Sequence, residues 1–371
     1  MVSPARFPGP RRVVVKVGSS GLRAPDGGLA GDVVGVLVDA VAALRTEGTE
    51  VVLVSSGAVA AGLAPLGLRQ RPTDLAQLQA AASVGQGLLV HAYQDRFARH
   101  GLACGQVLLT PGDVVDRARY LNARHTFDTL LSLGAVPLVN ENDTVVTDEL
   151  RFGDNDRLAA LVASMLGAQL LLLLSDVEGL LDGDPRTTPD LPVIGRVDDL
   201  GALSTHHFGP SASGLGSGGM ASKLEAARIA TFSAVHVVVA AALRPGVVLA
   251  AVHGEEVGTW FPPATRRPDS RKLWIAFAQQ PQGVIDIDAG AVRALVERGS
   301  SLLAAGVVDV RGAFTAGDAV DVAGPDGRVV ARGLVSYDAA TVSALRGRST
   351  ADLQGERARP VIHRDALAVT A

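Results

Sequence analysis

The stretch AVPLVNENDTVVTDELRFGDNDRLAALVASMLGAQLLLLLSD, residues 135–176, decides the fold class. It opens with a short apolar run and passes through a dense group of Asn, Asp and Glu. It continues as an Ala- and Leu-rich segment of helical length and ends in five consecutive leucines. Apolar runs without alternation are typical of strands that are buried on both faces of a parallel sheet. The stretch therefore predicts a strand–helix–strand unit with polar side chains between its elements.

The same alternation extends through the first two-thirds of the chain. We expect strands at 12–17, 50–54, 105–109, 135–140, 169–174 and 234–239, and helices at 32–46, 74–99, 118–133, 155–166 and 220–232. This order predicts an α/β fold in which helices sandwich a mainly parallel open sheet. Because such sheets bind ligands beyond the carboxyl ends of their strands, the loops after the strands are the expected place of a site.

The character of the sequence changes near residue 262. FPPATRRPDSRK, residues 261–272, is rich in Pro and Arg and indicates a linker. Beyond it, short β-like runs alternate with Gly and Asp, and GPDG at 324–327 has the composition of a hairpin turn. We predict a domain over 1–262, a linker over 263–272, a small β-rich domain over 273–360 and a C-terminal tail over 361–371.

Composition excludes several classes of protein. The 371 residues carry 34 Lys and Arg against 38 Asp and Glu, and this net charge of −4 gives no general attraction to a polyphosphate backbone. A single cysteine, Cys104, rules out an intrachain disulfide and a cysteine-cluster metal site. No apolar run reaches the roughly 18 to 20 residues of a membrane span, and the first residues lack the apolar core of a signal peptide. We therefore expect a soluble, cytoplasmic protein.

Two segments contain the residue types that bind phosphate. VVVKVGSS, residues 13–20, places Lys16 near the end of a strand, followed by Gly and two Ser that suit phosphate oxygens. SGLGSGGMASK, residues 213–223, is a glycine-rich loop before a helix, with Lys223 in its first turn. The alternatives are a strand-end lysine that reaches solvent and an ordinary surface loop. The second segment lacks the Gly-Lys-Ser/Thr of a Walker A motif.

Three further segments place polar groups directly after predicted strands. VSSGAVAAG, residues 54–62, opens a helix of small residues whose N-terminus favours an anion. NEND at 140–143 and GDND at 153–156 supply amides and carboxylates that can bind both charged ends of an amino acid, a lysine or hydrated Mg²⁺. Ser175 and Asp176 follow the leucine run, where a nucleotide can bind. A helix cap or an ordinary turn is the alternative for each segment taken alone.

The order of these segments along one α/β domain closely resembles that of the glutamate 5-kinases, of the amino-acid kinase family. The resemblance continues beyond the linker, where residues 298–322 look like the start of a PUA domain. It implies ATP-dependent phosphorylation of the γ-carboxylate of L-glutamate, the first step of L-proline biosynthesis. Ser175, Ser217 and Ala221 depart slightly from the family pattern but keep its small or hydroxyl character.

The resemblance also implies a role for each matching residue. Lys16 and Lys223 would neutralise charge on either side of the transferred phosphoryl group, and Asp156 would orient these two catalytic lysines. Glutamate-binding positions are matched by Ser56, Asp143 and Asn155. ATP-binding positions are matched by Lys16, Ser175, Asp176, Ser217, Gly218, Gly219, Met220, Ala221, Ser222 and Lys223. No protein ligand for a metal is assigned, and Mg²⁺ is expected to arrive with ATP.

L-glutamate and ATP are thus the expected partners, with L-proline as a feedback inhibitor and a homo-oligomeric assembly implied by the family alone. One alternative is another amino-acid kinase, acting on acetylglutamate, aspartate, carbamate or UMP; the NEND and GDND pair and the PUA-like domain argue against it. An RNA-binding or RNA-modifying protein is the other, since PUA domains occur there. Residues 263–371 carry 14 basic and 12 acidic side chains, so binding of nucleic acid through this part is not favoured.

Overall fold

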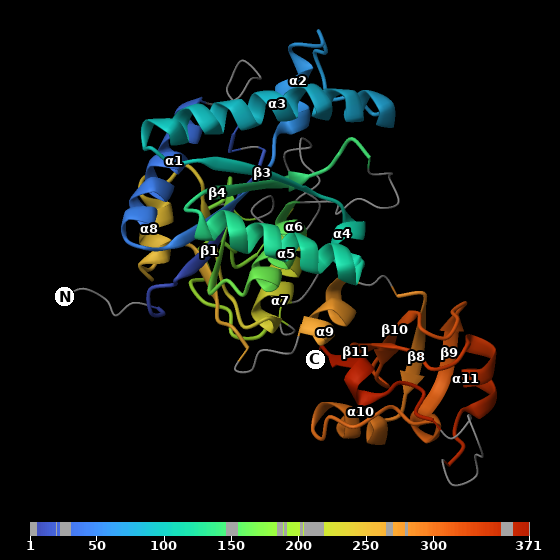
Figure 1. Cartoon of the computed structure of the whole chain (residues 1–371). Helices are drawn as coiled ribbons and strands as arrows, with labels where there is room; N and C mark the ends of the chain where they lie inside the picture. Colours follow the sequence, from blue (N-terminus) through green and yellow to red (C-terminus); the bar gives the residue numbers. More distant parts are fainter. Residues whose placement is uncertain are drawn as a thin grey trace. The chain divides into compact units, whose positions relative to one another are not determined.

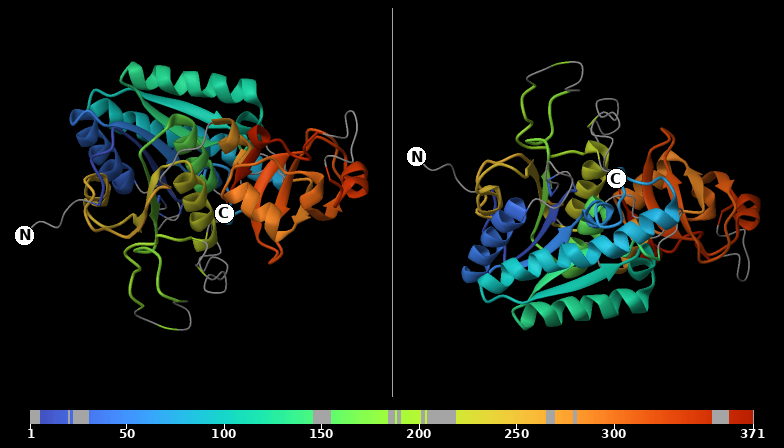
Figure 2. Two further views of the ribbon diagram at one scale, coloured as in Figure 1. Left: turned by 90° about the horizontal axis from the view of Figure 1, so that it is seen from below. Right: turned by 90° about the horizontal axis from the view of Figure 1, so that it is seen from above.

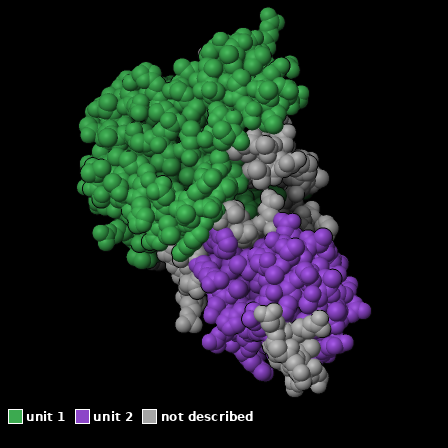
Figure 3. All heavy atoms as spheres, turned by 45° about the vertical axis from the view of Figure 1, so that its right-hand side comes forward, with its two compact units in different colours: residues 1–267 green, residues 268–371 purple. Residues whose placement is uncertain are grey.

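The computed structural model describes residues 6–19, 21–22, 31–145, 155–183, 188, 191–200, 203, 219–264, 270–278, 281–349 and 359–370 (Figure 1). Two compact units make up the chain, residues 1–267 and residues 268–371 (Figure 3). Each unit has its own sheet and its own apolar core. Among the described residues, no helix combines the length and the apolar character that crossing a bilayer requires.

A seven-stranded sheet forms the centre of the first unit, in the order β3-β4-β2-β1-β5-β6-β7. Its strands are β1 Arg12–Val17, β2 Glu50–Ser55, β3 Cys104–Leu109, β4 Val136–Glu141, β5 Leu170–Ser175, β6 His236–Ala241 and β7 Thr259–Phe261. All neighbouring strands are parallel except β6 and β7, which pair antiparallel at one edge. The mainly parallel sheet is confirmed, with each of the six predicted strands found to within two residues.

Helices cover both faces of this sheet (Figures 1 and 2). One face packs against α1 Gly31–Thr46, α3 Leu75–Arg99 and α8 Val247–Val252, and the other against α5 Arg117–Ser132, α6 Asn155–Leu166 and α7 Met220–Phe232. The described residues also form two short helices: α2 Ala58–Leu63, which packs along α3, and α4 Pro111–Val115. The five predicted helices are confirmed, and their ends differ from the prediction by at most one residue.

The alternation of side chains along β1 directs Lys16 towards α6 and α7. Val13, Val15 and Val17 belong to the apolar cluster that also contains side chains of α1, α3 and α8. Successive side chains of a strand point to opposite faces of the sheet. Lys16 therefore points to the face that α6 and α7 cover, and it does so from a central strand that is buried from Val13 to Val17.

A five-stranded sheet, in the order β12-β11-β10-β8-β9, forms the second unit. Its strands are β8 Gly283–Ile287, β9 Val307–Gly312, β10 Ala319–Ala323, β11 Val329–Leu334 and β12 Leu367–Val369, and its helices include α10 Ala289–Val296 and α11 Ala339–Leu345. Strands β8 and β10 are parallel and the other pairs antiparallel. The predicted turn at 324–327 joins β10 and β11, with the N–H of Gly327 donating to the carbonyl of Gly324 at 2.9 Å.

Both ends of the second unit carry more structure than the sequence indicates. Residues 361–371 were predicted to form a tail. They supply β12 to the sheet. At the other end, α9 Ser270–Leu273 runs into a π-helical turn, Trp274–Ala278. The guanidinium of Arg332 on β11 donates to the carbonyl of Ala276 at 2.9 Å and ties this turn to the sheet. The described residues from Ser270 onward therefore pack within the second unit.

Candidate active site

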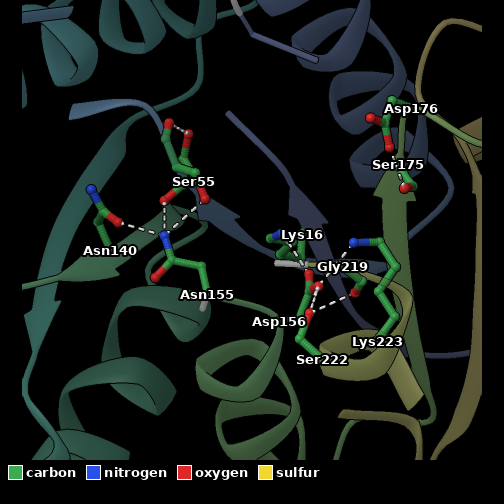
Figure 4. Close-up of polar contacts among 11 residues, drawn as sticks. Lys16, Ser55, Asn140, Asn155, Asp156, Ser175, Asp176, Gly219, Ser222 and Lys223 are labelled. Atoms are coloured by element: carbon green, nitrogen blue, oxygen red, sulfur yellow. Dashed lines mark hydrogen bonds and ion pairs between the residues drawn. The ribbon is translucent and has the colours of Figure 1, made fainter. Parts of the chain in front are cut away.

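Polar side chains of the first unit gather beyond the carboxyl ends of its central strands and at the N-termini of α6 and α7 (Figure 4). Lys16 is the penultimate residue of β1, and Asp156 and Lys223 lie in the first turns of α6 and α7. This is the edge of the sheet where the sequence predicts a site. Two clusters can be distinguished there, one of charged side chains and one of amides and hydroxyls.

The charged cluster has Asp156 at its centre, between two lysines (Figure 4). The Nζ of Lys16 lies 2.5 Å from Asp156 Oδ1, and the Nζ of Lys223 lies 3.0 Å from Asp156 Oδ2. All three side chains are buried, with exposed fractions of 4%, 0% and 8% for Lys16, Asp156 and Lys223. Together they carry one net positive charge, which favours an anion at this place.

Burial and charge act in opposite directions on Asp156. Burial raises the pKa of this carboxyl, but the ammonium groups of Lys16 and Lys223 outweigh it and lower the pKa to about 2. The side chain is therefore an ionised carboxylate at neutral pH, and each of its oxygens faces a lysine. Such a group orients cations; it is not available to accept a proton from a substrate.

Contacts between α6 and α7 hold this cluster in place. The hydroxyl of Ser222, next to Lys223, donates to Asp156 Oδ2 at 3.1 Å and to the carbonyl of Gly219 at 2.8 Å. Further along the same helix pair, Arg157 forms an ion pair with Glu225. The alignment of Lys223 with Asp156 thus follows from the packing of α6 against α7. The residues that meet there lie more than 60 positions apart in the chain.

The second cluster consists of amides and hydroxyls around Asn155, the first residue of α6. The Nδ2 of Asn155 donates to three acceptors: the carbonyl of Ser55 at 3.0 Å, the Oγ of Ser56 at 2.9 Å and the Oδ1 of Asn140 at 2.9 Å. Asn140 belongs to β4, and Ser55 and Ser56 lie at the end of β2. Two of the predicted glutamate-binding residues, Ser56 and Asn155, are therefore in direct contact.

Asp143, the third residue predicted to bind glutamate, lies two positions beyond the last residue of β4 and is half-buried. It belongs to the same carboxyl edge of the sheet as Asn140. Its predicted role in binding glutamate stays a prediction.

Apart from Lys16 on β1, the residues predicted to bind ATP lie at the end of β5 and at the start of α7. Ser175 ends β5, the strand beside β1, and its hydroxyl donates to Asp176 Oδ1 at 3.1 Å. Gly219 precedes α7, and Met220, Ala221, Ser222 and Lys223 form its first turn. Two other predicted residues, Ser217 and Gly218, lie outside the described residues. With Lys16 of β1, the described residues of this set thus come from three elements, β1, β5 and α7, that meet at one edge of the sheet.

The acidic and other possible ligand side chains of the site do not suit a divalent metal. Within the described ranges there is no group of three or more His, Cys, Asp and Glu side chains that could hold a metal ion. Asp156, the buried carboxylate of the site, has a lysine at each oxygen. Both of its oxygens thus contact ammonium groups, and the described residues do not form a cage for Mg²⁺.

Two residues of α3 reach the site and were not predicted. The amide of Gln86 lies 2.8 Å from Asn140, and the hydroxyl of Tyr93 lies 3.2 Å from the hydroxyl of Ser55. Tyr93 is completely buried, and this burial raises the pKa of its phenol. Within the sequence, both residues lie inside a long helix. Gln86 is flanked by two glycines and Tyr93 stands among ordinary polar helix residues such as Gln94, so neither is marked as part of a site.

Comparison with known proteins identifies the family of this chain. Residues 11–241 match the Amino acid kinase family, and residues 283–355 match the PUA domain. A glutamate 5-kinase from Streptomyces avermitilis is 54% identical over 363 residues, which are 96% of each chain. One from Salinispora arenicola is 54% identical over 362 residues, covering 96% of this chain and 97% of its own. A UMP kinase structure from Bacillus anthracis aligns with a TM-score of 0.48 and 15% identity, over 68% of this chain and 96% of its own.

The chain belongs to the amino acid kinase family. Within that family, its similarity to relatives over nearly their whole length places it among the glutamate 5-kinases, with a PUA domain in its C-terminal part. Both parts of the predicted resemblance are thereby confirmed.

Proposed function

We propose that this protein transfers the γ-phosphoryl group of ATP to the γ-carboxylate of L-glutamate, which yields γ-glutamyl phosphate and ADP. This is the first step of L-proline biosynthesis. The observation that carries the proposal is the buried cluster of Lys16, Asp156 and Lys223 beside the N-terminus of α7. The reaction requires such a cluster because an anionic acceptor must approach an anionic phosphoryl group.

The chemistry of the acceptor explains why the site needs no general base. A γ-carboxyl group has a reference pKa of about 4.3 and is already ionised near neutral pH. Its oxygen can attack phosphorus without giving up a proton. Catalysis then depends on positioning the two reactants and on stabilising negative charge as it moves.

In this proposal the two lysines stabilise that charge. Lys16 on β1 and Lys223 on α7 would contact oxygens of the transferring phosphoryl group from two sides, and Asp156 holds both ammonium groups in position. The low pKa of Asp156 supports this orienting role, because the carboxylate remains charged wherever the enzyme is folded at ordinary pH. Removing either lysine should therefore affect the transition state more than substrate binding.

The amide and hydroxyl cluster is proposed as the acceptor site. Ser56 and Asn155 would bind the α-amino and α-carboxylate groups of L-glutamate, with Asp143 as a further partner of the ammonium group. The place of Ser56 and Asp143 just beyond β2 and β4, and of Asn155 directly before Asp156 on α6, supports this, since the cluster lies beside the charged one along the carboxyl edge of the sheet.

ATP is proposed to bind at the end of β5 and the start of α7. Ser175 and Asp176 would contact the nucleoside, and the segment 217–223 the phosphates, where the N-terminus of a 13-residue helix favours anions. Mg²⁺ would enter as part of the MgATP substrate, held by phosphate oxygens and water. We further propose, from the family relationship, that L-proline inhibits the enzyme and that the enzyme is a homo-oligomer.

The test is an assay of ADP release with a panel of acceptors: L-glutamate, L-aspartate, N-acetyl-L-glutamate, carbamate and UMP. Hydroxylamine in the assay converts an acyl phosphate into a hydroxamate, which is measured by colour with ferric ion. We expect ADP release and hydroxamate formation with L-glutamate alone. Equal turnover with another member of the panel, or ADP release without hydroxamate, would contradict the proposal.

A further inference from the structure

We propose that Gln86 on α3 is a positioning residue of the acceptor site, which selects the ammonium group of the substrate by orienting Asn140 and, through it, Asn155. This inference rests on the proposed function, because it assumes that Asn155 contacts the amino-acid acceptor. Gln86 itself does not belong to the residues assigned above to substrate, nucleotide or catalysis.

A continuous chain of hydrogen bonds connects Gln86 to the acceptor site. The Nδ2 of Asn140 donates to Gln86 Oε1 at 2.8 Å. The Oδ1 of Asn140 accepts from the Nδ2 of Asn155 at 2.9 Å, and the same Nδ2 lies 2.9 Å from the hydroxyl oxygen of Ser56. Three elements, α3, β4 and α6, therefore join in one line of amides that ends at two proposed substrate contacts.

A backbone group determines which way each amide faces. The backbone N–H of Glu141 donates to Asn140 Oδ1 at 2.9 Å, and a backbone N–H can only donate. Asn140 must therefore turn its oxygen towards Glu141 and its Nδ2 towards α3. The side-chain carbonyl oxygen of Gln86 accepts a hydrogen bond from that Nδ2. Gln86 is thus the first member of the line of hydrogen bonds.

This orientation has a consequence for Asn155. Because its Nδ2 is shared among Asn140, Ser55 and Ser56, the two N–H groups of the amide are occupied. Within the described part of the chain, no donor approaches the Oδ1 of Asn155, which is left to accept from a ligand. Ser56, whose oxygen accepts from Asn155, keeps its hydroxyl proton for a ligand acceptor. The pair thus presents one acceptor and one donor, which matches an ammonium and a carboxylate.

The NH2 group of the Gln86 amide supports a role beyond packing. Among the described residues, the buried Nε2 of Gln86 has no hydrogen-bond partner. A buried donor without a partner costs free energy, and an apolar side chain of the same length would avoid that cost. This unpartnered donor occurs at the one position of α3 from which a side-chain carbonyl oxygen contacts Asn140.

Close packing keeps α3 in register with the site. Gly85, directly before Gln86, lies so near α2 that a Cβ atom there would be 1.8 Å from the carbonyl oxygen of Ala58. The backbone of α3 therefore contacts the start of α2, the helix that follows Ser55 and Ser56. Gln86 is held at a defined distance from Asn140 by this backbone contact.

The experiment compares Gln86→Met with wild type in steady-state assays with L-glutamate and with glutarate, which is L-glutamate without the amino group. Methionine keeps the length of the side chain and removes the carbonyl acceptor. We expect the KM for L-glutamate to rise on the order of five- to tenfold, as for the loss of one neutral hydrogen bond. The KM for ATP and the melting temperature should stay near those of wild type.

The preference for L-glutamate over glutarate, measured as the ratio of kcat/KM values, should fall by a similar factor, because the ammonium contact is what becomes disordered. Gln86→Glu keeps an acceptor oxygen for Asn140 and should change this preference by less than about twofold. Gln94→Met is the matched control: Gln94 lies on the same helix, is exposed and should leave all constants unchanged.

An unchanged preference in Gln86→Met, or an equal loss of affinity for L-glutamate and ATP, would overturn the role of Gln86. The same effect in Gln94→Met would also overturn it, since the change would then be a general effect on α3. If the wild-type enzyme transfers no phosphoryl group to L-glutamate at all, the proposed function fails instead, and the two failures are thereby distinguished.

Discussion

Lysine is scarce in this protein, and its distribution points to chemistry. Only three of the 34 basic side chains are lysines: Lys16, Lys223 and Lys272. Two of these three contact the same buried carboxylate. An ammonium group is a compact charge that can share one carboxylate with a second cation and still direct N–H groups elsewhere, whereas a guanidinium is a wide planar fork. At the residue scale, then, two of the three lysines of the chain belong to the proposed reaction centre.

Lys223→Met should lower kcat on the order of 10², because one donor to the transferring phosphoryl group is lost. The KM for L-glutamate should change by no more than about threefold, since the interaction is made mainly in the transition state. Steady-state kinetics with both substrates measure this, with Lys272→Met in the second unit as the control. A near-normal kcat in Lys223→Met would refute the assignment.

Asp156→Asn should destabilise the fold by about 3 to 5 kcal/mol at pH 7, since it leaves two buried ammonium groups without their counter-charge. The pKa of this carboxyl is about 2 in the folded protein, against 3.8 ordinarily. Its contribution is therefore present above pH 4 and is lost as the pH falls from about 4 towards 2. The difference between wild type and variant in urea unfolding should accordingly shrink over that range.

The matched control is Asp39→Asn, which removes a carboxylate that is 69% exposed and faces His100. It should change the free energy of unfolding by less than about 0.5 kcal/mol. A loss in Asp156→Asn no larger than this would show that the buried lysines do not depend on Asp156.

At the scale of elements, the sequence reveals those whose signal is local. The ends of the five long helices follow from apolar periodicity and from caps such as Asp74, whose side chain accepts from the N–H of Gln77. Strand β7 was missed because Thr-Trp-Phe is too short to show a period and pairs with β6 only through tertiary packing. Segment order indicated Lys16, Asp156 and Lys223, since each lies near the end of a recognisable strand or in the first turn of a recognisable helix.

The supporting residues of α3 could not be predicted in this way. Gln86 meets Asn140 across 54 positions of sequence, and Tyr93 meets Ser55 across 38. Neither partner is visible from the helix itself, where a Gln and a Tyr are compatible with a solvent-facing stripe or with a core contact. Only the placement of α3 against β2 and β4 makes them part of the site.

Gly85→Ala tests the closeness of α2 and α3. A methyl group there would be 1.8 Å from the carbonyl oxygen of Ala58 and 2.5 Å from the backbone nitrogen of Gly62, so the helices must move apart. We expect the free energy of unfolding to fall by about 1 to 3 kcal/mol or more, as it does when a core is overpacked. Because only Gly57 separates Ser56 from α2, the KM for L-glutamate should rise as well.

Gly87→Ala is the control on the same helix, since a Cβ atom at Gly87 meets nothing within 4 Å. Alanine should stabilise the helix there by up to about 1 kcal/mol, because glycine is the poorer helix former. Urea unfolding of both variants decides the matter. Equal effects of the two substitutions would contradict the proposed backbone contact.

At the scale of the whole molecule, each unit contains the means to fold by itself. The main apolar cluster of the first unit draws its buried members from residues 7–260, and that of the second unit from residues 285–367. Among the described residues, each sheet consists of strands from its own unit. Every described residue of the proposed reaction precedes residue 224. We therefore propose a domain boundary near Arg267, within the predicted linker.

A chain that ends after Arg267 should fold and keep its kinase activity, because the seven-stranded sheet and all proposed catalytic residues remain. Circular dichroism, thermal melting and the hydroxamate assay measure this. As a contrast, a chain that ends after Ser233 lacks β6 and β7 and exposes the buried leucines of β5, and it should aggregate. A folded but inactive 1–267 chain would show that the second unit completes the active site, and aggregation of that chain would show that the first unit cannot close its own core.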